Sequence, residues 1–224
     1  MVKLFAVKTL CEDHFRQLVP MFSPDKRIEE LLHRGKNKLA AQHNILSYLL
    51  MRKVLISQYP LHPNEIVIAV NEHSKPYLSG KSLPHFNLSH SGEWVVGAFS
   101  EKPIGIDIEK IKRVNLKVAE RFFSLPEIRF LNELNEVERD LWFLKFWTIK
   151  ESYLKALGTG LSRSMSSFVA SYHDGVFHIT DDENPEKIFL DHRVFEQNYL
   201  VSVSAYEPDI QNEIVIYDVT NLIA

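Results

Sequence analysis

Two carboxylates stand two residues apart in the segment GIDIE, residues 105–109. Polar and apolar side chains alternate there, which predicts a strand with Asp107 and Glu109 on one face and both isoleucines on the other. Neighbouring carboxylates repel each other unless a cation lies between them. Such oxygen ligands suit Mg²⁺, which commonly binds one or two protein carboxylates together with phosphate oxygens. The alternative is a solvated strand edge that carries alternating acids.

A second group of candidates lies in the segment WTIKESYLK, residues 147–155. In a helix, Glu151 and Lys155 share a face, and Trp147 lies one turn earlier on it. The plain interpretation is a surface ion pair that adds only a few tenths of a kcal/mol to helix stability. The functional interpretation makes Glu151 a third metal ligand and Lys155 a phosphate contact or proton donor.

The segment NLSHSG, residues 87–92, combines hydroxyls, an imidazole and a glycine between two predicted strands. This combination suits an anion-binding corner, and a polar hairpin turn is the alternative. Ser89 and His90 are adjacent in sequence, but adjacency does not make a catalytic dyad, because such dyads are defined by spatial geometry.

Hydrophobic periodicity predicts an α+β scaffold for these segments. Strands are predicted at residues 3–8, 66–70, 85–91, 94–99 and 105–111, and helices at 39–58, 118–123, 125–134 and 141–157, followed by alternating segments. Ser23 is the expected cap of an additional early helix.

The order of these elements repeats along the chain. Phe-Ser at residues 22–23 and at 123–124 each begins a helical segment that precedes a long helix. The strand at 94–99 has a counterpart at 199–206. This predicts two similar halves, 1–102 and 103–224, related by a pseudo-twofold axis in one compact body.

Composition narrows the classes of function. The chain has 224 residues and a formal net charge of −3, which argues against general nucleic-acid binding. No apolar run approaches the ~18 residues that a membrane span needs, and the start lacks the features of a signal peptide. The single cysteine, Cys11, fits a reducing compartment, so we expect a cytoplasmic protein.

Taken together and in order, the motifs resemble those of the Sfp-type 4′-phosphopantetheinyl transferases. The matching segments are KPYL (75–78), FNLSHSG (86–92), GIDIE (105–109), RFFSLPE (121–127) and WTIKESYLKALGTGL (147–161), with SPDKR at 23–27. The resemblance implies the fold of that family, a pseudo-twofold monomer with its active site between the halves. It also implies the Mg²⁺-dependent transfer of 4′-phosphopantetheine from coenzyme A to a carrier-protein serine, with release of 3′,5′-ADP.

The resemblance assigns catalytic roles to five residues. Asp107, Glu109 and Glu151 would hold Mg²⁺, with Mn²⁺ as an alternative, beside the coenzyme A pyrophosphate. Glu127 resembles the general base that takes the proton of the carrier serine. Lys155 resembles the group that contacts coenzyme A and neutralises or protonates the departing 3′,5′-ADP.

The resemblance also implies a coenzyme A pocket. Lys75, Ser89 and His90 resemble contacts to the 3′-phosphate and nearby phosphate oxygens. Lys26 resembles a basic nucleotide contact, and Lys150 would add positive charge near the pyrophosphate. Such a pocket needs only a local concentration of charge, not a basic chain.

The chain departs from the family pattern in the early long helix. Family members often carry an arginine there that binds the nucleotide, whereas this chain has His43 and Asn44. His43, Arg52 and Arg34 are the candidates to replace that contact. We therefore expect weaker coenzyme A binding than in an arginine-bearing relative.

The partners implied by the resemblance are apo acyl or peptidyl carrier proteins of fatty-acid, polyketide or nonribosomal-peptide synthesis. The region from Lys112 to Phe123 would meet the carrier, with Arg113 and Lys117 attracting its acidic surface. Two alternatives use the same residues: a Mg²⁺-dependent phosphohydrolase or nuclease, and a non-catalytic carrier-protein binder.

Overall fold

The structure is a computed structural model that describes residues 1–22, 26–34, 37–59, 61–80 and 83–223. The predicted cap Ser23 lies outside these residues. The strands are β1 (Lys3–Lys8), β2 (Ile68–Val70), β3 (Pro76–Leu78), β4 (His85–Ser91), β5 (Trp94–Ser100), β6 (Ile104–Lys110), β7 (Val169–His173), β8 (Val176–Thr180), β9 (Phe189–Phe195), β10 (Tyr199–Ala205) and β11 (Val215–Tyr217). The helices are α1 (Glu12–Leu18), α2 (Lys26–Arg34), α3 (Lys38–Gln58), α4 (Lys117–Phe122), α5 (Leu125–Asn132), α6 (Glu136–Leu157) and α7 (Val219–Ile223).

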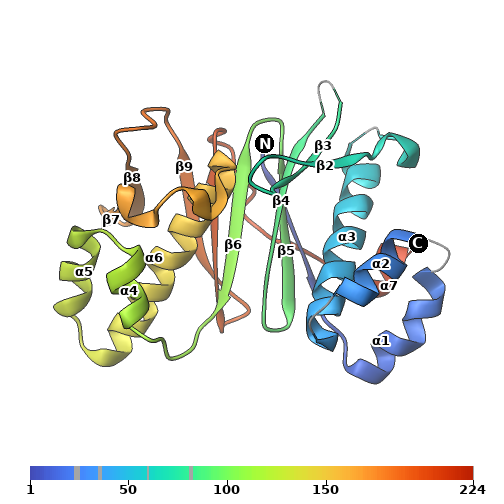
Figure 1. Cartoon of the computed structure of the whole chain (residues 1–224), viewed down its shortest axis with the longest axis horizontal. Coiled ribbons are helices and arrows are strands. Elements are labelled where there is room, and N and C mark those ends of the chain that lie inside the picture. Colours follow the sequence, from blue (N-terminus) through green and yellow to red (C-terminus); the bar gives the residue numbers. More distant parts are fainter. Residues whose placement is uncertain (23–25, 35–36, 60, 81–82, 224) are drawn as a thin grey trace.

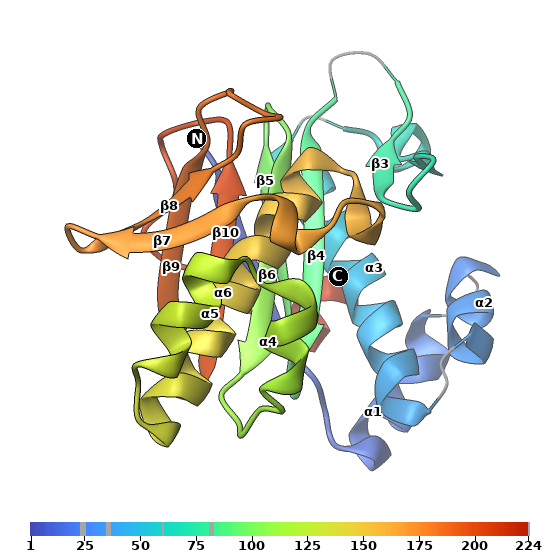
Figure 2. The ribbon, with the colours of Figure 1, turned by 60° about the vertical axis from the view of Figure 1, so that its left-hand side comes forward.

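Two sheets lie in the middle of the molecule, with helices on both outer sides (Figure 1). The first sheet has the strand order β11-β1-β5-β4, and the second has the order β6-β10-β9. Their facing sides share one apolar core that includes Leu4, Val96, Ile106 and Val203. α3 covers the outer face of the first sheet and α6 that of the second (Figures 1 and 2). The predicted α+β class is confirmed.

Alternation along β1 and β5 explains this layering. Phe5 and Val7 pack toward α3, whereas Leu4 and Ala6 face the second sheet. Side chains of successive strand residues point to opposite faces, so both faces of the strand are buried. The completely buried pattern of β5 has the same cause.

The two long helices have clear sequence signals at their ends. Asn37 caps α3 by accepting a hydrogen bond from the amide of Ala40 at 2.9 Å. Asn135 caps α6 in the same way, and Gly158 ends it in the left-handed conformation at φ 76°. The prediction that this helix begins at residue 141 was wrong, because its polar first turn, EVERD, hides the apolar periodicity.

The first and second halves resemble each other in arrangement, as the sequence repeat suggests. In each half a long helix packs on antiparallel strands. The chain then crosses back: β11 pairs in parallel with β1, with Phe5 opposite Val215, and α7 packs on α3. The last strand and helix therefore complete the layers of the first half.

The length and hydropathy of the helices bear on the prediction that the chain has no membrane span. Within the ranges that the structure describes, no helix combines the length and apolar character required to cross a bilayer.

Candidate active site

The predicted alternation of β6 is borne out in the fold. Ile106 and Ile108 are buried in the core between the sheets, and Asp107 and Glu109 point away from that core. Gly105 shares their face and lies directly against the backbone of α6, since an added Cβ would come 1.9 Å from the carbonyl oxygen of Ser152. This close approach brings the acids of β6 beside the residues of α6.

β4 and β6 lie side by side where the two sheets meet (Figure 2), and side chains of β4 form hydrogen bonds with β6. The side-chain oxygen of Asn87 accepts the amide of Ile106 at 2.8 Å. Further along, Ser89 Oγ donates to Asp107 Oδ1 at 2.8 Å, and Ser91 Oγ donates to Glu109 Oε2 at 3.1 Å. We call this row the seam. It explains why polar residues alternate in the segment NLSHS.

Lys155 completes the contacts of Asp107. Its Nζ donates to Asp107 Oδ1 at 2.7 Å, to Ser89 Oγ at 3.0 Å and to the carbonyl of Ile106 at 3.1 Å. The structure thus brings together residues from β4, β6 and α6 that the sequence places far apart. Their predicted proximity to one another is confirmed, while their chemical roles stay predictions.

Glu151 lies beside these acids. Burial raises the pKa of its carboxyl, and the negative charges of Asp107 and Glu109 raise it further, whereas Lys155 lowers it. We call Asp107, Glu109 and Glu151 the acid cluster. Crowded carboxylates of this kind favour the binding of a cation.

The carboxylate oxygens of the acid cluster are suitable ligands for a divalent cation. Asp107 Oδ2 is buried and has no hydrogen-bond partner, so one ligand oxygen is free. Among the residues that the structure describes, however, no three His, Cys, Asp or Glu side chains converge into a closed metal-binding group. A metal at this cluster would therefore also need oxygens from the substrate or water, as Mg²⁺ commonly does.

Lys75 lies at the same end of α6. Its Nζ donates to the carbonyl oxygens of Ile104, at 3.1 Å, and of Lys155. Burial, with a smaller effect from the charge of Lys155, lowers the pKa of Lys75 to about 8. Asn71, which the sequence analysis missed, supports it: its side chain accepts the Lys75 amide at 2.8 Å and donates to the Gly158 carbonyl at 2.8 Å. An asparagine in a turn segment is the signal that could have identified it.

The lowered pKa of Lys75 gives a testable expectation. Competitive labelling of amines across pH, read by peptide mass spectrometry, should titrate Lys75 with a pKa of about 8, well below the 10.5 of a free lysine. As pH rises, the Lys75 ammonium group loses its proton at a lower pH in the folded chain than in the unfolded chain. The free energy of unfolding should therefore rise with pH between about 8 and 10.5. Titration of Lys75 at or above the 10.5 of a free lysine would contradict the expectation.

His90 and His43 form a stacked pair near the seam. Their ring centroids lie 4.3 Å apart, and His43 Nε2 lies 2.9 Å from the carbonyl oxygen of Gly92. Partial burial and the neighbouring His43 and Lys155 lower the pKa of His90 to about 4. His43 is 5% exposed and its Nε2 is already bonded, so it supports the turn at Gly92.

Arg52 is another candidate for the missing arginine contact, and it lies near an aromatic ring of its own helix. The Arg52 guanidinium lies 5.7 Å from the ring centroid of Tyr48 on the same helix. The side chains of Arg34 and of the predicted nucleotide contact Lys26 lie outside the part of the chain that is described.

Glu127 and Lys150 bind each other rather than the acid cluster. Glu127 Oε1 lies 2.5 Å from Lys150 Nζ, and both side chains are 0% exposed. The expected position of Lys150 beside a pyrophosphate is not what the fold provides, because its ammonium group is buried and donates to the Phe168 carbonyl at 2.7 Å. Glu127 as a base stays a prediction that this burial does not support.

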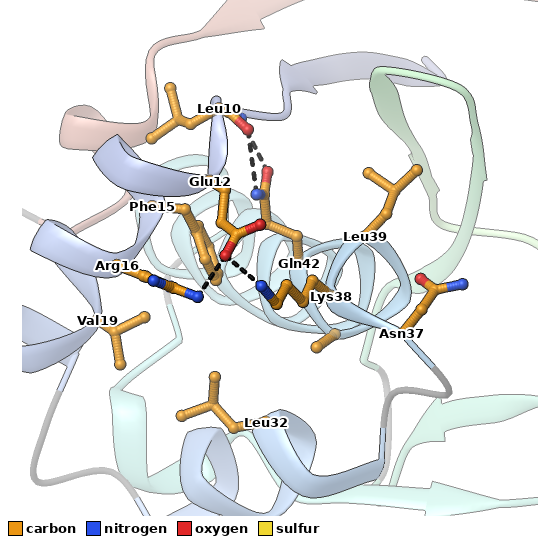
Figure 3. Close-up of a pocket in the computed structure, with 11 residues that line it drawn as sticks. Leu10, Glu12, Phe15, Arg16, Val19, Leu32, Asn37, Lys38, Leu39 and Gln42 are labelled. Carbon is orange, nitrogen blue, oxygen red and sulfur yellow. Dashed lines mark hydrogen bonds and ion pairs between the residues drawn. The ribbon is translucent and has the colours of Figure 1, made fainter.

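Two cavities bear on the location of binding. One, of about 670 Å³, lies between α1, α2 and the start of α3, where Glu12 pairs with Arg16 and Lys38 (Figure 3). None of the predicted site residues whose side chains the structure describes lines it. The second, of about 240 Å³, adjoins Glu109 and is walled by residues that include Val114 and Trp147. The smaller cavity is therefore the one that belongs to the acid cluster.

Two protein-family models match the chain. Residues 103–204 match the family model described as the 4'-phosphopantetheinyl transferase superfamily, and residues 12–102 match that of the 4'-phosphopantetheinyl transferase N-terminal region.

Full-length relatives extend the match to almost the whole chain. The chain is 34% identical over 214 residues to 4'-phosphopantetheinyl transferase ffp of Bacillus subtilis, covering 95% of each chain. It is 33% identical over 221 residues to 4'-phosphopantetheinyl transferase Sfp of Bacillus subtilis strain 168, covering 98% of each. A holo-(acyl-carrier-protein) synthase of Bacillus anthracis solved in complex with CoA (3',5'-ADP) is 22% identical, with a TM-score of 0.41, over 46% of this chain and 92% of that one. Because the two Bacillus subtilis transferases are 34% and 33% identical to it across nearly its whole length, the chain belongs to the 4′-phosphopantetheinyl transferase family.

Proposed function

We propose that the chain transfers the 4′-phosphopantetheine group of coenzyme A to a serine of an apo acyl or peptidyl carrier protein. The observation that carries the proposal is the cluster of Asp107, Glu109 and Glu151 beside Lys155, at the meeting point of the two sheets. The serine oxygen attacks the phosphorus that bears pantetheine and gives its proton to water. The pyrophosphate P–O bond breaks, and 3′,5′-ADP leaves with the electron pair.

The acid cluster would hold Mg²⁺ or Mn²⁺ in this reaction. A bound divalent ion screens the negative pyrophosphate oxygens and stabilises the leaving group. The unpartnered, buried Asp107 Oδ2 supports this part of the proposal.

Lysines and the seam would bind the rest of coenzyme A. Lys155 lies within hydrogen-bond distance of Asp107 and would neutralise the departing nucleotide. Ser89 and His90 at the end of β4, together with Lys75, would contact phosphate oxygens. Neutral His90 would act as a hydrogen-bond donor, since its pKa is lowered to about 4.

The carrier protein would bind beside Glu109. The cavity there joins apolar Val114, Val118 and Trp147 to the basic side chains Lys112 and Arg113. An apolar groove with a basic edge suits a partner with an acidic surface. We further propose that the protein acts as a monomer, because each half supplies part of one site. We also propose that it acts in the cytoplasm.

The direct test is intact-mass spectrometry of an apo peptidyl carrier protein incubated with this protein, coenzyme A and Mg²⁺. We expect the carrier to gain the mass of one phosphopantetheine, and to gain none when EDTA is added. No gain on peptidyl or acyl carriers, together with phosphate release from simple esters, would support the phosphohydrolase instead. No gain but stable carrier binding would support the non-catalytic binder.

A further inference from the structure

Glu127 and Lys150 form an ion pair with no exposed side-chain surface. Charged side chains are almost never fully buried unless they are paired, and the desolvation cost of such a pair is large. The acid lies in the first turn of the short helix α5, and the lysine lies in the second half of α6. The pair therefore connects two helices at a point that is buried from solvent.

Every contact of the Glu127 carboxylate is with the chain itself. Oε1 accepts from Lys150 Nζ at 2.5 Å and from the Ala170 amide at 2.6 Å. Oε2 accepts the Ser124 amide at 2.7 Å, so the Glu127 side chain caps the start of α5. A general base must come within about 3 Å of the proton it removes, or reach it through one water. The enclosed carboxylate has no surface on which an incoming serine could lie.

Lys150 is equally enclosed. Its Nζ donates to the Phe168 carbonyl at 2.7 Å and lies 4.4 Å from the centroid of the Phe168 ring. The Phe123 ring, 6.0 Å away, lies near it as well. The pair thus joins three segments: the start of α5, the second half of α6 and the entry to β7.

Of these segments, α6 lines the cavity beside Glu109, and aromatic contacts connect its lining residues to the residues just before α5. Phe123 stacks on Phe143 with ring centroids 5.0 Å apart, and Phe122 meets Trp147 edge-on at 5.6 Å. Phe143 and Trp147 both line the cavity. Movement of α5 relative to α6 would therefore change the surface that we assign to the carrier protein.

We propose that Glu127 and Lys150 act as a positioning pair, which fixes α4 and α5 against α6, and that Glu127 does not accept the serine proton. This inference rests on the proposed function for its kinetic consequences only. Its structural part, the coupling between the two buried charges, holds whatever reaction the protein catalyses.

The test is a double-mutant cycle of Glu127→Gln, Lys150→Met and the double variant, followed by thermal unfolding and transfer kinetics. Each single change leaves one charge buried without its partner, so both should lower Tm and raise KM for the carrier protein. Removing both charges should bring Tm and KM back toward wild type and leave kcat and the pH–rate profile unchanged, because replacing both partners of a buried pair is often nearly neutral.

A base at Glu127 gives a different result. Glu127→Gln and the double variant would then both lose about 100-fold or more in kcat, together with one limb of the pH–rate profile, and this would overturn the proposal. Glu12→Gln/Lys38→Met is the matched control, since that ion pair is exposed and lies away from the acid cluster. Absence of transfer by the wild-type protein would refute the proposed function, whereas additive Tm losses in the cycle would refute the positioning pair separately.

Discussion

Transfer of phosphopantetheine by the Asp107→Asn variant is expected to be about a thousandfold slower than by the wild-type protein. Asparagine keeps the shape of the side chain and an acceptor oxygen for Ser89 and Lys155. It removes the negative charge and the free Oδ2 that fit a divalent cation. The loss should therefore fall mainly on kcat and on metal affinity, measured by the intact-mass assay over a titration of Mg²⁺ or Mn²⁺.

A matched carboxylate on the same sheet serves as the control. Asp191 on β9 pairs with Arg193, away from the acid cluster, so Asp191→Asn should leave the transfer rate within about twofold of wild type. Thermal unfolding should show that both variants fold. Transfer by Asp107→Asn at more than about a tenth of the wild-type rate would mean that this carboxylate does not bind the metal.

The Gly105→Ala variant is expected to lose about 4 kcal/mol or more of its free energy of unfolding. The added methyl carbon would lie 1.9 Å from the carbonyl oxygen of Ser152 and 2.4 Å from the amide nitrogen of Ala156. Both atoms belong to the backbone of α6, so no side-chain rotation can relieve the overlap. Urea unfolding followed by circular dichroism measures the loss, and transfer activity should fall with it because β6 must move away from α6.

Gly175 provides the comparison for this substitution. It lies in the turn between β7 and β8 with nothing within 4 Å of an added Cβ, but its φ is +81°. Gly175→Ala should therefore cost only about 1 kcal/mol, from backbone conformation alone. Equal losses in the two alanine variants would show that the close approach of β6 to α6 is not what makes Gly105 necessary.

The sequence was most informative where one local pattern determines the result. Strict alternation in β6 correctly separated Asp107 and Glu109 from the buried isoleucines, and helical spacing put Glu151 and Lys155 on one face. In each case the periodicity of a single element decides which way a side chain points.

The remaining features depend on contacts between distant segments. The hydrogen bonds from Ser89 and Ser91 to the acids exist because the edge strands of two separate sheets meet, which no local pattern predicts. The burial of Lys150 was missed because a lysine is normally exposed, and only the arrangement of α5, α6 and β7 gives it a partner. The parallel pairing of β11 with β1 was missed for the same reason, since it joins opposite ends of the chain.

That pairing has a consequence for how the protein forms during synthesis. The first sheet needs β11 at its edge and α3 needs α7, yet both elements are translated after residue 214. Domains commonly fold from the N-terminus while the ribosome is still at work. Here the edge of the first sheet at β1 would stay unpaired until β11 in the second half has been translated. We therefore expect folding to finish as one late step, in which both halves and the site between them become ordered together.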